Sequence, residues 1–95
     1  MDATTRLQKG RRATYQTVAE EAILIHMDTG TYYSLNRVGT EFWDLLDGAQ
    51  TLQQHAATLA ERYHVDAAMV LGDLLELGQH LHSEDLVEVV QTQLT

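Results

Sequence analysis

The chain has 95 residues, a formal net charge of -8 and no cysteine. Its length suits a single domain, and the lack of cysteine excludes disulfides and thiolate metal sites. No apolar run follows the first basic residues as it would in a secretory signal, and no segment approaches the roughly 20 apolar residues of a membrane span. These features predict a cytoplasmic protein that has no membrane partner.

The basic residues are concentrated near the N-terminus, at Arg6, Lys9, Arg11 and Arg12. We expect residues 1–12 to form a flexible basic arm, which is either solvated or docks on an acidic partner. Residues 13–90 should form the folded domain, followed by a C-terminal tail at residues 91–95.

Three short segments predict an N-terminal antiparallel sheet. Thr14–Val18 alternates β-favouring and polar residues, and Ala22–Met27 is a short apolar run. The turn sequence Asp-Thr-Gly follows, in which Gly30 can adopt positive φ, and Thr31–Leu35 then returns as the partner strand. On this last strand Tyr33 should face the core with Thr31 and Leu35, while Tyr32 and Ser34 face outward or line a groove.

Helix signals follow the sheet in order. Asn36 can cap a first helix, Thr51 and Gln54 fit a capping box for a second, and Asp66 can cap a third. The predicted elements are helices over Arg37 to about Asp47, Leu52 to about Tyr63 and Ala67 to about Leu81, then a strand over Leu86–Val90. This order predicts an α+β fold that is winged helix-turn-helix-like: a three-stranded antiparallel sheet, three helices and a short C-terminal strand.

The third predicted helix is apolar on more than one side, which is typical of a helix with more than one neighbour. One stripe comprises Val70, Leu74, Leu77 and Leu81, and a shallower one comprises Ala68, Met69, Gly72 and Leu75. Gly72 costs about 1 kcal/mol of helix propensity. It indicates either close packing on a neighbour or a notch for another backbone, rimmed by Asp73 and Glu76.

A winged helix often binds DNA, but the charges argue against nucleic acid here. The segment from Tyr63 to Thr95 has no lysine or arginine and carries several carboxylates. DNA binding requires cations that neutralise phosphates.

Catalysis and metal binding are equally unsupported. No two of the five histidines are four residues apart, although His80 and His82 could bind a metal weakly. There is no phosphate-binding glycine loop and no serine elbow. We therefore expect a protein that is not an enzyme and needs no cofactor or metal.

Two stretches, HMDTGTYYSLNRVGTEFWDLLDG and TLQQHAATLAERYHVDAAMVLGDLLELGQHLHSEDLVEV, carry a resemblance. Together they make the segment from about Ala22 to Val90 similar to the PqqD family. The resemblance implies a recognition element for ribosomally made, post-translationally modified peptides. Such a domain binds the leader segment of a precursor peptide as an extra strand beside its third strand and against its third helix.

Carried over to this sequence, the resemblance implies a non-catalytic peptide site on a strand edge and a helix face. An edge strand offers free N–H and C=O groups for strand addition. The expected site residues are Thr31, Tyr32, Tyr33, Ser34 and Leu35 on the strand, and Val65, Ala68, Met69, Gly72, Asp73 and Glu76 on or before the helix.

The resemblance is strongest to the free-standing small B protein of lasso-peptide biosynthesis. This implies a precursor peptide, a leader peptidase and a cyclase as partners. The alternatives are a PqqD-type peptide chaperone in pyrroloquinoline quinone assembly, or a protein-interaction module of an unrelated pathway. The free edge also allows a weak dimer beside the monomer.

Overall fold

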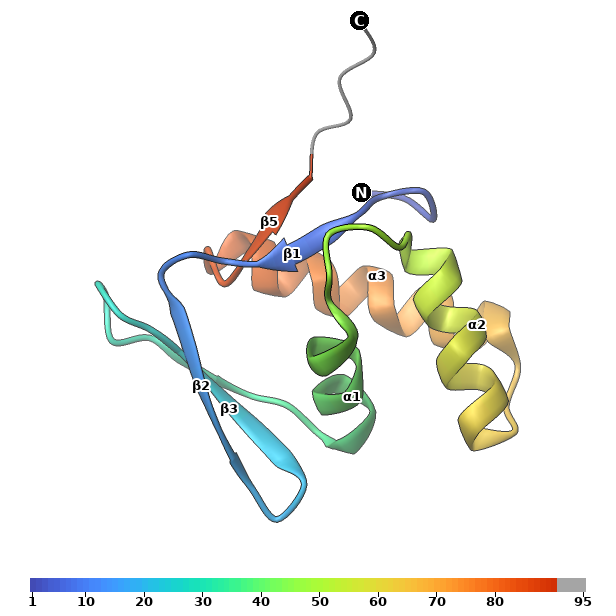
Figure 1. Cartoon of the computed structure of the whole chain (residues 1–95), viewed down its shortest axis with the longest axis horizontal. Coiled ribbons are helices and arrows are strands. Elements are labelled where there is room, and N and C mark those ends of the chain that lie inside the picture. Colours follow the sequence, from blue (N-terminus) through green and yellow to red (C-terminus); the bar gives the residue numbers. More distant parts are fainter. Residues whose placement is uncertain (91–95) are drawn as a thin grey trace, which may run out of the picture.

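The computed structural model describes residues 1–90 and has the predicted α+β class, with a winged helix-turn-helix-like order of elements (Figure 1). Residues 91–95, the predicted tail, lie outside the described residues. The elements are β1 (Leu7–Lys9), β2 (Ala13–Val18), β3 (Glu21–His26), β4 (Tyr32–Ser34), α1 (Arg37–Leu45), α2 (Leu52–Tyr63), α3 (Ala67–Ser83) and β5 (Val87–Val89). None of the helices within residues 1–90 has the length and hydrophobicity needed to cross a membrane.

The predicted N-terminal sheet is confirmed, with antiparallel strands in the order β2-β3-β4. A two-residue turn joins β2 to β3, and both of its residues, Ala19 and Glu20, have positive φ. Such turns match the twist of the flanking strands. The β3–β4 turn contains Gly30 at φ +74°, as the sequence predicted. β3 is therefore the central strand, and β2 and β4 are the two edges.

The structure corrects the prediction of a flexible arm over residues 1–12. Leu7–Lys9 forms β1, which pairs antiparallel with β5 in a second, two-stranded sheet. The side chain of Leu7 is fully buried, and the Arg6 guanidinium donates to the carbonyl oxygen of Ala49 at 2.9 Å. The N-terminal segment is therefore an integral part of the domain.

The core lies between the inner face of the three-stranded sheet and the helices. Leu24 of β3, Phe42 and Trp43 of α1, and Leu59 of α2 are fully buried there. The buried hydroxyl of Thr40 accepts a hydrogen bond from the backbone N–H of Ala22 at 2.8 Å. This bond fixes α1 on β3 and satisfies a backbone donor that would otherwise be costly to bury.

All three predicted helix starts are confirmed by their caps. Asn36 Oδ1 accepts from the N–H of Gly39 at 2.8 Å, and the Asp66 carboxylate accepts from the N–H of Ala68 at 3.0 Å. Thr51 and Gln54 form the reciprocal capping box. α1 ends at Leu45, slightly before the expected end, and α3 continues to Ser83.

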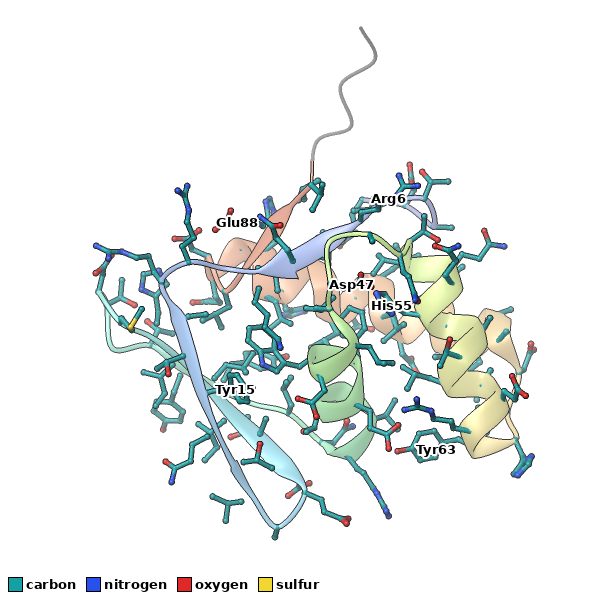
Figure 2. All side chains as sticks on the ribbon, viewed as in Figure 1. Arg6, Tyr15, Asp47, His55, Tyr63 and Glu88 are labelled. Carbon is teal, nitrogen blue, oxygen red and sulfur yellow. The ribbon has the colours of Figure 1, made fainter. Side chains whose placement is uncertain are left out.

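His55 is a buried polar residue in the core. Its ring lies edge-to-face on Phe42, with 5.6 Å between ring centroids, and neither ring nitrogen has a hydrogen-bond partner within the described residues. Burial lowers the pKa of His55 below its usual 6.5, and the nearby Asp47 carboxylate partly opposes this (Figure 2). At pH 7 and above, the folded protein therefore holds His55 in its neutral form.

This burial predicts a loss of stability in mild acid. The unfolded chain takes up the proton near pH 6.5 while the folded chain resists it, so stability is complete above pH 6.5 and falls as pH drops below it. One such group gives a slope of at most about 1.4 kcal/mol per pH unit. Urea unfolding between about pH 5 and 7.5 should show this slope, and His55→Leu should reduce it. The exposed-site control His82→Gln should leave it in place; an unchanged slope in His55→Leu would contradict the assignment.

Candidate functional site

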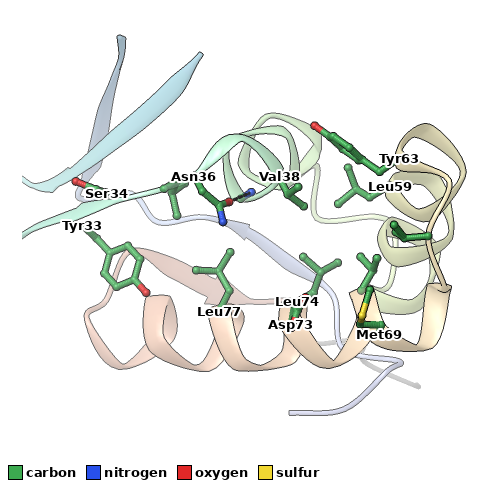
Figure 3. A pocket seen from close by; sticks show the side chains of 14 residues that line it. Tyr33, Ser34, Asn36, Val38, Leu59, Tyr63, Met69, Asp73, Leu74 and Leu77 are labelled. Carbon is green, nitrogen blue, oxygen red and sulfur yellow. Dashed lines mark hydrogen bonds between the residues drawn. The ribbon is translucent and has the colours of Figure 1, made fainter. Parts of the chain in front are cut away.

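A mostly apolar groove of about 630 Å³ opens between the end of β4, the start of α1 and the helix pair α2–α3 (Figure 3). Asp73 is the one formally charged residue among those that line it. The lining residues are Tyr33, Ser34, Leu35, Asn36, Val38, Gly39, Leu59, Tyr63, Val65, Met69, Val70, Asp73, Leu74 and Leu77. A groove of this size and polarity fits apolar side chains of a ligand.

The backbone of β4 presents a free edge beside this groove. The N–H of His26 donates to Thr31 O, and the N–H of Leu35 donates to Ala22 O, both at 2.8 Å. In an antiparallel pair the backbone groups of successive residues point to opposite sides. Thr31, Tyr33 and Leu35 thus direct their backbone groups toward β3. Tyr32 and Ser34 direct theirs to the outer edge, where no strand within residues 1–90 pairs with β4.

The side chains of β4 follow the predicted alternation. Leu35 is buried, and Tyr33 packs partly against the core and lines the groove. Tyr32 points to solvent with 71% of its surface exposed. Thr31 was expected to face the core with Tyr33, but it is exposed and does not line the groove. It lies between the turn residue Gly30 and the first residue of β4.

The structure brings six of the expected site residues together in the groove wall: Tyr33, Ser34, Leu35, Val65, Met69 and Asp73. Met69 and Val65 are apolar, yet 57% and 42% of their surface is exposed to solvent. Figure 3 shows Met69 and Asp73 on the α3 side of the groove and Tyr33 on the β4 side. Exposed apolar side chains beside a groove are typical of a binding surface, because covering them with a ligand removes apolar area from water.

Three expected residues of α3, namely Ala68, Gly72 and Glu76, are exposed but do not line the groove. At 3.6 residues per turn, the groove-lining positions 69, 73 and 77 leave Ala68 on the far side of the helix and Gly72 turned away. A Cβ at Gly72 would meet nothing within 4 Å, so Gly72 is not closely packed on a neighbour. Glu76 lies nearest to the groove rim of the three.

The groove also contains residues that sequence reasoning missed. Asn36, Val38 and Gly39 come from the first turn of α1, and Leu59 and Tyr63 come from α2. The N-cap at Asn36, shortly after the end of β4, could have indicated these residues. It places the first turn of α1 beside the end of the strand. Val70, Leu74 and Leu77, which belong to the first predicted apolar stripe of α3, also border the groove.

Tyr63 introduces a polar atom into this apolar wall. Its hydroxyl is buried near the Glu41 carboxylate, but it makes no hydrogen bond of normal geometry within the described residues. Desolvation raises the pKa of Tyr63, and the neighbouring Glu41 carboxylate raises it further. The phenol is therefore neutral at physiological pH.

The described residues contain no group of three or more histidine and acidic side chains that could hold a metal ion.

Comparisons with known proteins identify the fold and its relatives. The family described as coenzyme PQQ synthesis protein D (PqqD) matches residues 21–87, and the chain belongs to this family. Among solved structures, the chain is similar to one described as TbiB1 in complex with the TbiA(β) leader peptide. The two share 27% sequence identity and a TM-score of 0.77, over 85% of this chain and 94% of the other. No curated protein matches the sequence.

The unpartnered hydroxyl of Tyr63 predicts the effect of removing it. A buried polar group without a partner costs about 1–3 kcal/mol, so Tyr63→Phe should leave the free energy of unfolding unchanged or raise it. Chemical denaturation monitored by circular dichroism measures this directly. Tyr32→Phe, which removes an exposed hydroxyl, serves as the control and should be neutral within about 0.5 kcal/mol. A destabilisation of about 1 kcal/mol or more in Tyr63→Phe would mean that the hydroxyl is bonded in solution.

Proposed function

We propose that this protein binds the leader segment of a ribosomally synthesised precursor peptide as a strand added to the edge of β4. One observation carries the proposal: the free edge of β4 and the apolar groove share a wall, so a single extended peptide can use both. Membership of the PqqD family and similarity to a leader-peptide complex of TbiB1 support it.

The geometry of an added strand explains how affinity and selectivity arise. Its backbone would exchange hydrogen bonds with Tyr32 and Ser34, the residues whose backbone groups face outward. Alternate side chains of the peptide would point into the groove between β4 and α3, while the others would point to the face that carries Tyr32. The backbone bonds give affinity for any extended segment, and the apolar groove selects particular side chains.

The role that follows is that of an adaptor without catalytic chemistry of its own. By its resemblance to the small B proteins of lasso-peptide biosynthesis, we propose that it delivers the bound precursor to a leader peptidase and a cyclase. Pyrroloquinoline quinone assembly is the alternative pathway. The neighbouring genes distinguish the two, because the first requires an asparagine-synthetase-like cyclase and the second a radical enzyme. A protein-interaction module of an unrelated pathway remains the rival from a different class.

Strand addition predicts that the N–H of Tyr32 contributes to binding. Tyr32→Pro removes this outward donor without removing a hydrogen bond to β3, so the fold should persist. Affinity for a labelled leader peptide from the neighbouring precursor gene should fall about tenfold or more in fluorescence anisotropy. Tyr32→Ala keeps the N–H and should bind more tightly than Tyr32→Pro.

Two results would count against strand addition. Equal affinities of wild type and a folded Tyr32→Pro would exclude β4 as the pairing edge. Absence of binding by the folded wild type would reject leader recognition for that precursor and favour the interaction module.

The groove predicts a contrast between two neighbouring residues of α3. Met69→Glu places a charge in the apolar groove wall beside Asp73 and should weaken leader binding about tenfold or more. Ala68→Glu adds the same charge on the opposite side of the helix and should leave the affinity within about twofold. Anisotropy titrations of both variants at one ionic strength measure this. Equal losses would show that net charge, and not the groove, controls binding.

A further inference from the structure

The sheet has a second free edge, on β2, that the proposed peptide site does not use. β2 ends the strand order β2-β3-β4, and its residues from Thr14 to Val18 are exposed. The N–H of Met27 donates to Arg12 O at 2.7 Å, so the alternation along β2 directs Thr14, Gln16 and Val18 toward β3. The backbone groups of Tyr15 and Thr17 therefore face outward. In Figure 1 the β2–β3 hairpin projects away from the helices.

This edge lacks the features that usually prevent strand pairing. Edge strands are commonly protected by a charged side chain, a proline, a bulge or a short length. β2 has the sequence ATYQTV, pairs residue for residue with β3 and spans six residues, against three in β4. An uncharged, regular edge is unexpected in a chain with a net charge of -8.

The charges that flank β2 indicate what pairs with it. Arg11 and Arg12 precede the strand, and Glu20 and Glu21 follow it. A second copy of β2, running antiparallel, would set the basic end of each strand beside the acidic end of the other. A parallel copy would bring like charges together, which is unfavourable.

We infer that two copies of this chain associate through antiparallel pairing of their β2 strands, forming one continuous six-stranded sheet. A two-fold axis at Gln16 places Tyr15 of one copy opposite Thr17 of the other, and these are the residues with outward backbone groups. Thr14 then lies opposite Val18, a cross-strand pair without charge. The interface is isologous, since the same residues contribute from both sides.

Existing ion pairs at the ends of β2 do not oppose this arrangement strongly. The existing pairs are Arg11–Glu88 at 3.6 Å, Arg12–Asp28 at 2.9 Å and Arg37–Glu20 at 3.4 Å. Five of these six side chains are at least half exposed, and the sixth, Glu88, is 31% exposed. Exposed pairs contribute little, so exchanging or sharing a partner costs little.

The pairing leaves both peptide grooves accessible. β3 and β4 separate the β2 edge from the groove, so each copy in the dimer keeps a free β4 edge. A single strand pair buries less than the roughly 800 Å² per partner of a standard interface, so the dimer is weak and depends on concentration.

The test is sedimentation equilibrium of the full-length protein from about 10 μM to about 1 mM. The mean mass of the wild type should rise from one chain toward two, and added salt should weaken the association. Thr17→Pro, which removes an outward N–H, should lower the association constant about tenfold or more. Tyr32→Pro, on the other edge, should leave it unchanged.

Charge exchange provides an independent test that needs no proline. Neither the variant R11E/R12E nor the variant E20R/E21R should form a homodimer, because like charges then flank both ends of β2. Mixed in equal amounts, the two should associate with each other, since each glutamate end then meets an arginine end. A monomeric wild type at about 1 mM, or a dimer that these variants leave unaffected, would overturn the inference. Neither result depends on whether leader peptide binds at β4.

Discussion

The attachment of β3 to α1 is the constraint on which the rest of the structure depends. The N–H of Ala22 donates to the Thr40 hydroxyl of α1, and the carbonyl oxygen of Ala22 accepts from the N–H of Leu35. The helix and the end of β4 are thus fixed at one point of the central strand. α1 begins directly after β4, because Asn36 caps it there. As a result the edge of β4 and the groove lie side by side, which the proposed peptide site requires.

Much of the fold could be predicted because its signals are local. The turn at Gly30, the cap at Asn36 and the capping box at Thr51 each act within a few residues, and each occurs where the sequence predicted it. β1 could not be predicted in this way. It is three residues long and pairs Leu7 with Val89, so its signal lies at the opposite end of the sequence.

The two halves of the site were predictable to different degrees. On β4 a period of two residues leaves only two faces, and the core-facing position of Leu35 determines which side Tyr33 takes. On α3 both apolar stripes are compatible with a partner. The sequence does not show which stripe lies beside β4. In the structure Met69, Asp73 and Leu77 line the groove, and Gly72 does not. The rotation of α3 about its own axis decides this, and that rotation is set by long-range packing.

Trp43 gives the molecule an optical property that follows from its position. It is the single tryptophan of the chain, it is fully buried, and it does not line the groove. Its ring meets Tyr15 of β2 edge-on, with 5.8 Å between ring centroids, and the Lys9 ammonium lies 5.6 Å from its centroid. Its intrinsic fluorescence should therefore be insensitive to a ligand on α3. It would instead report on the environment of β2 and on the integrity of the N-terminal segment.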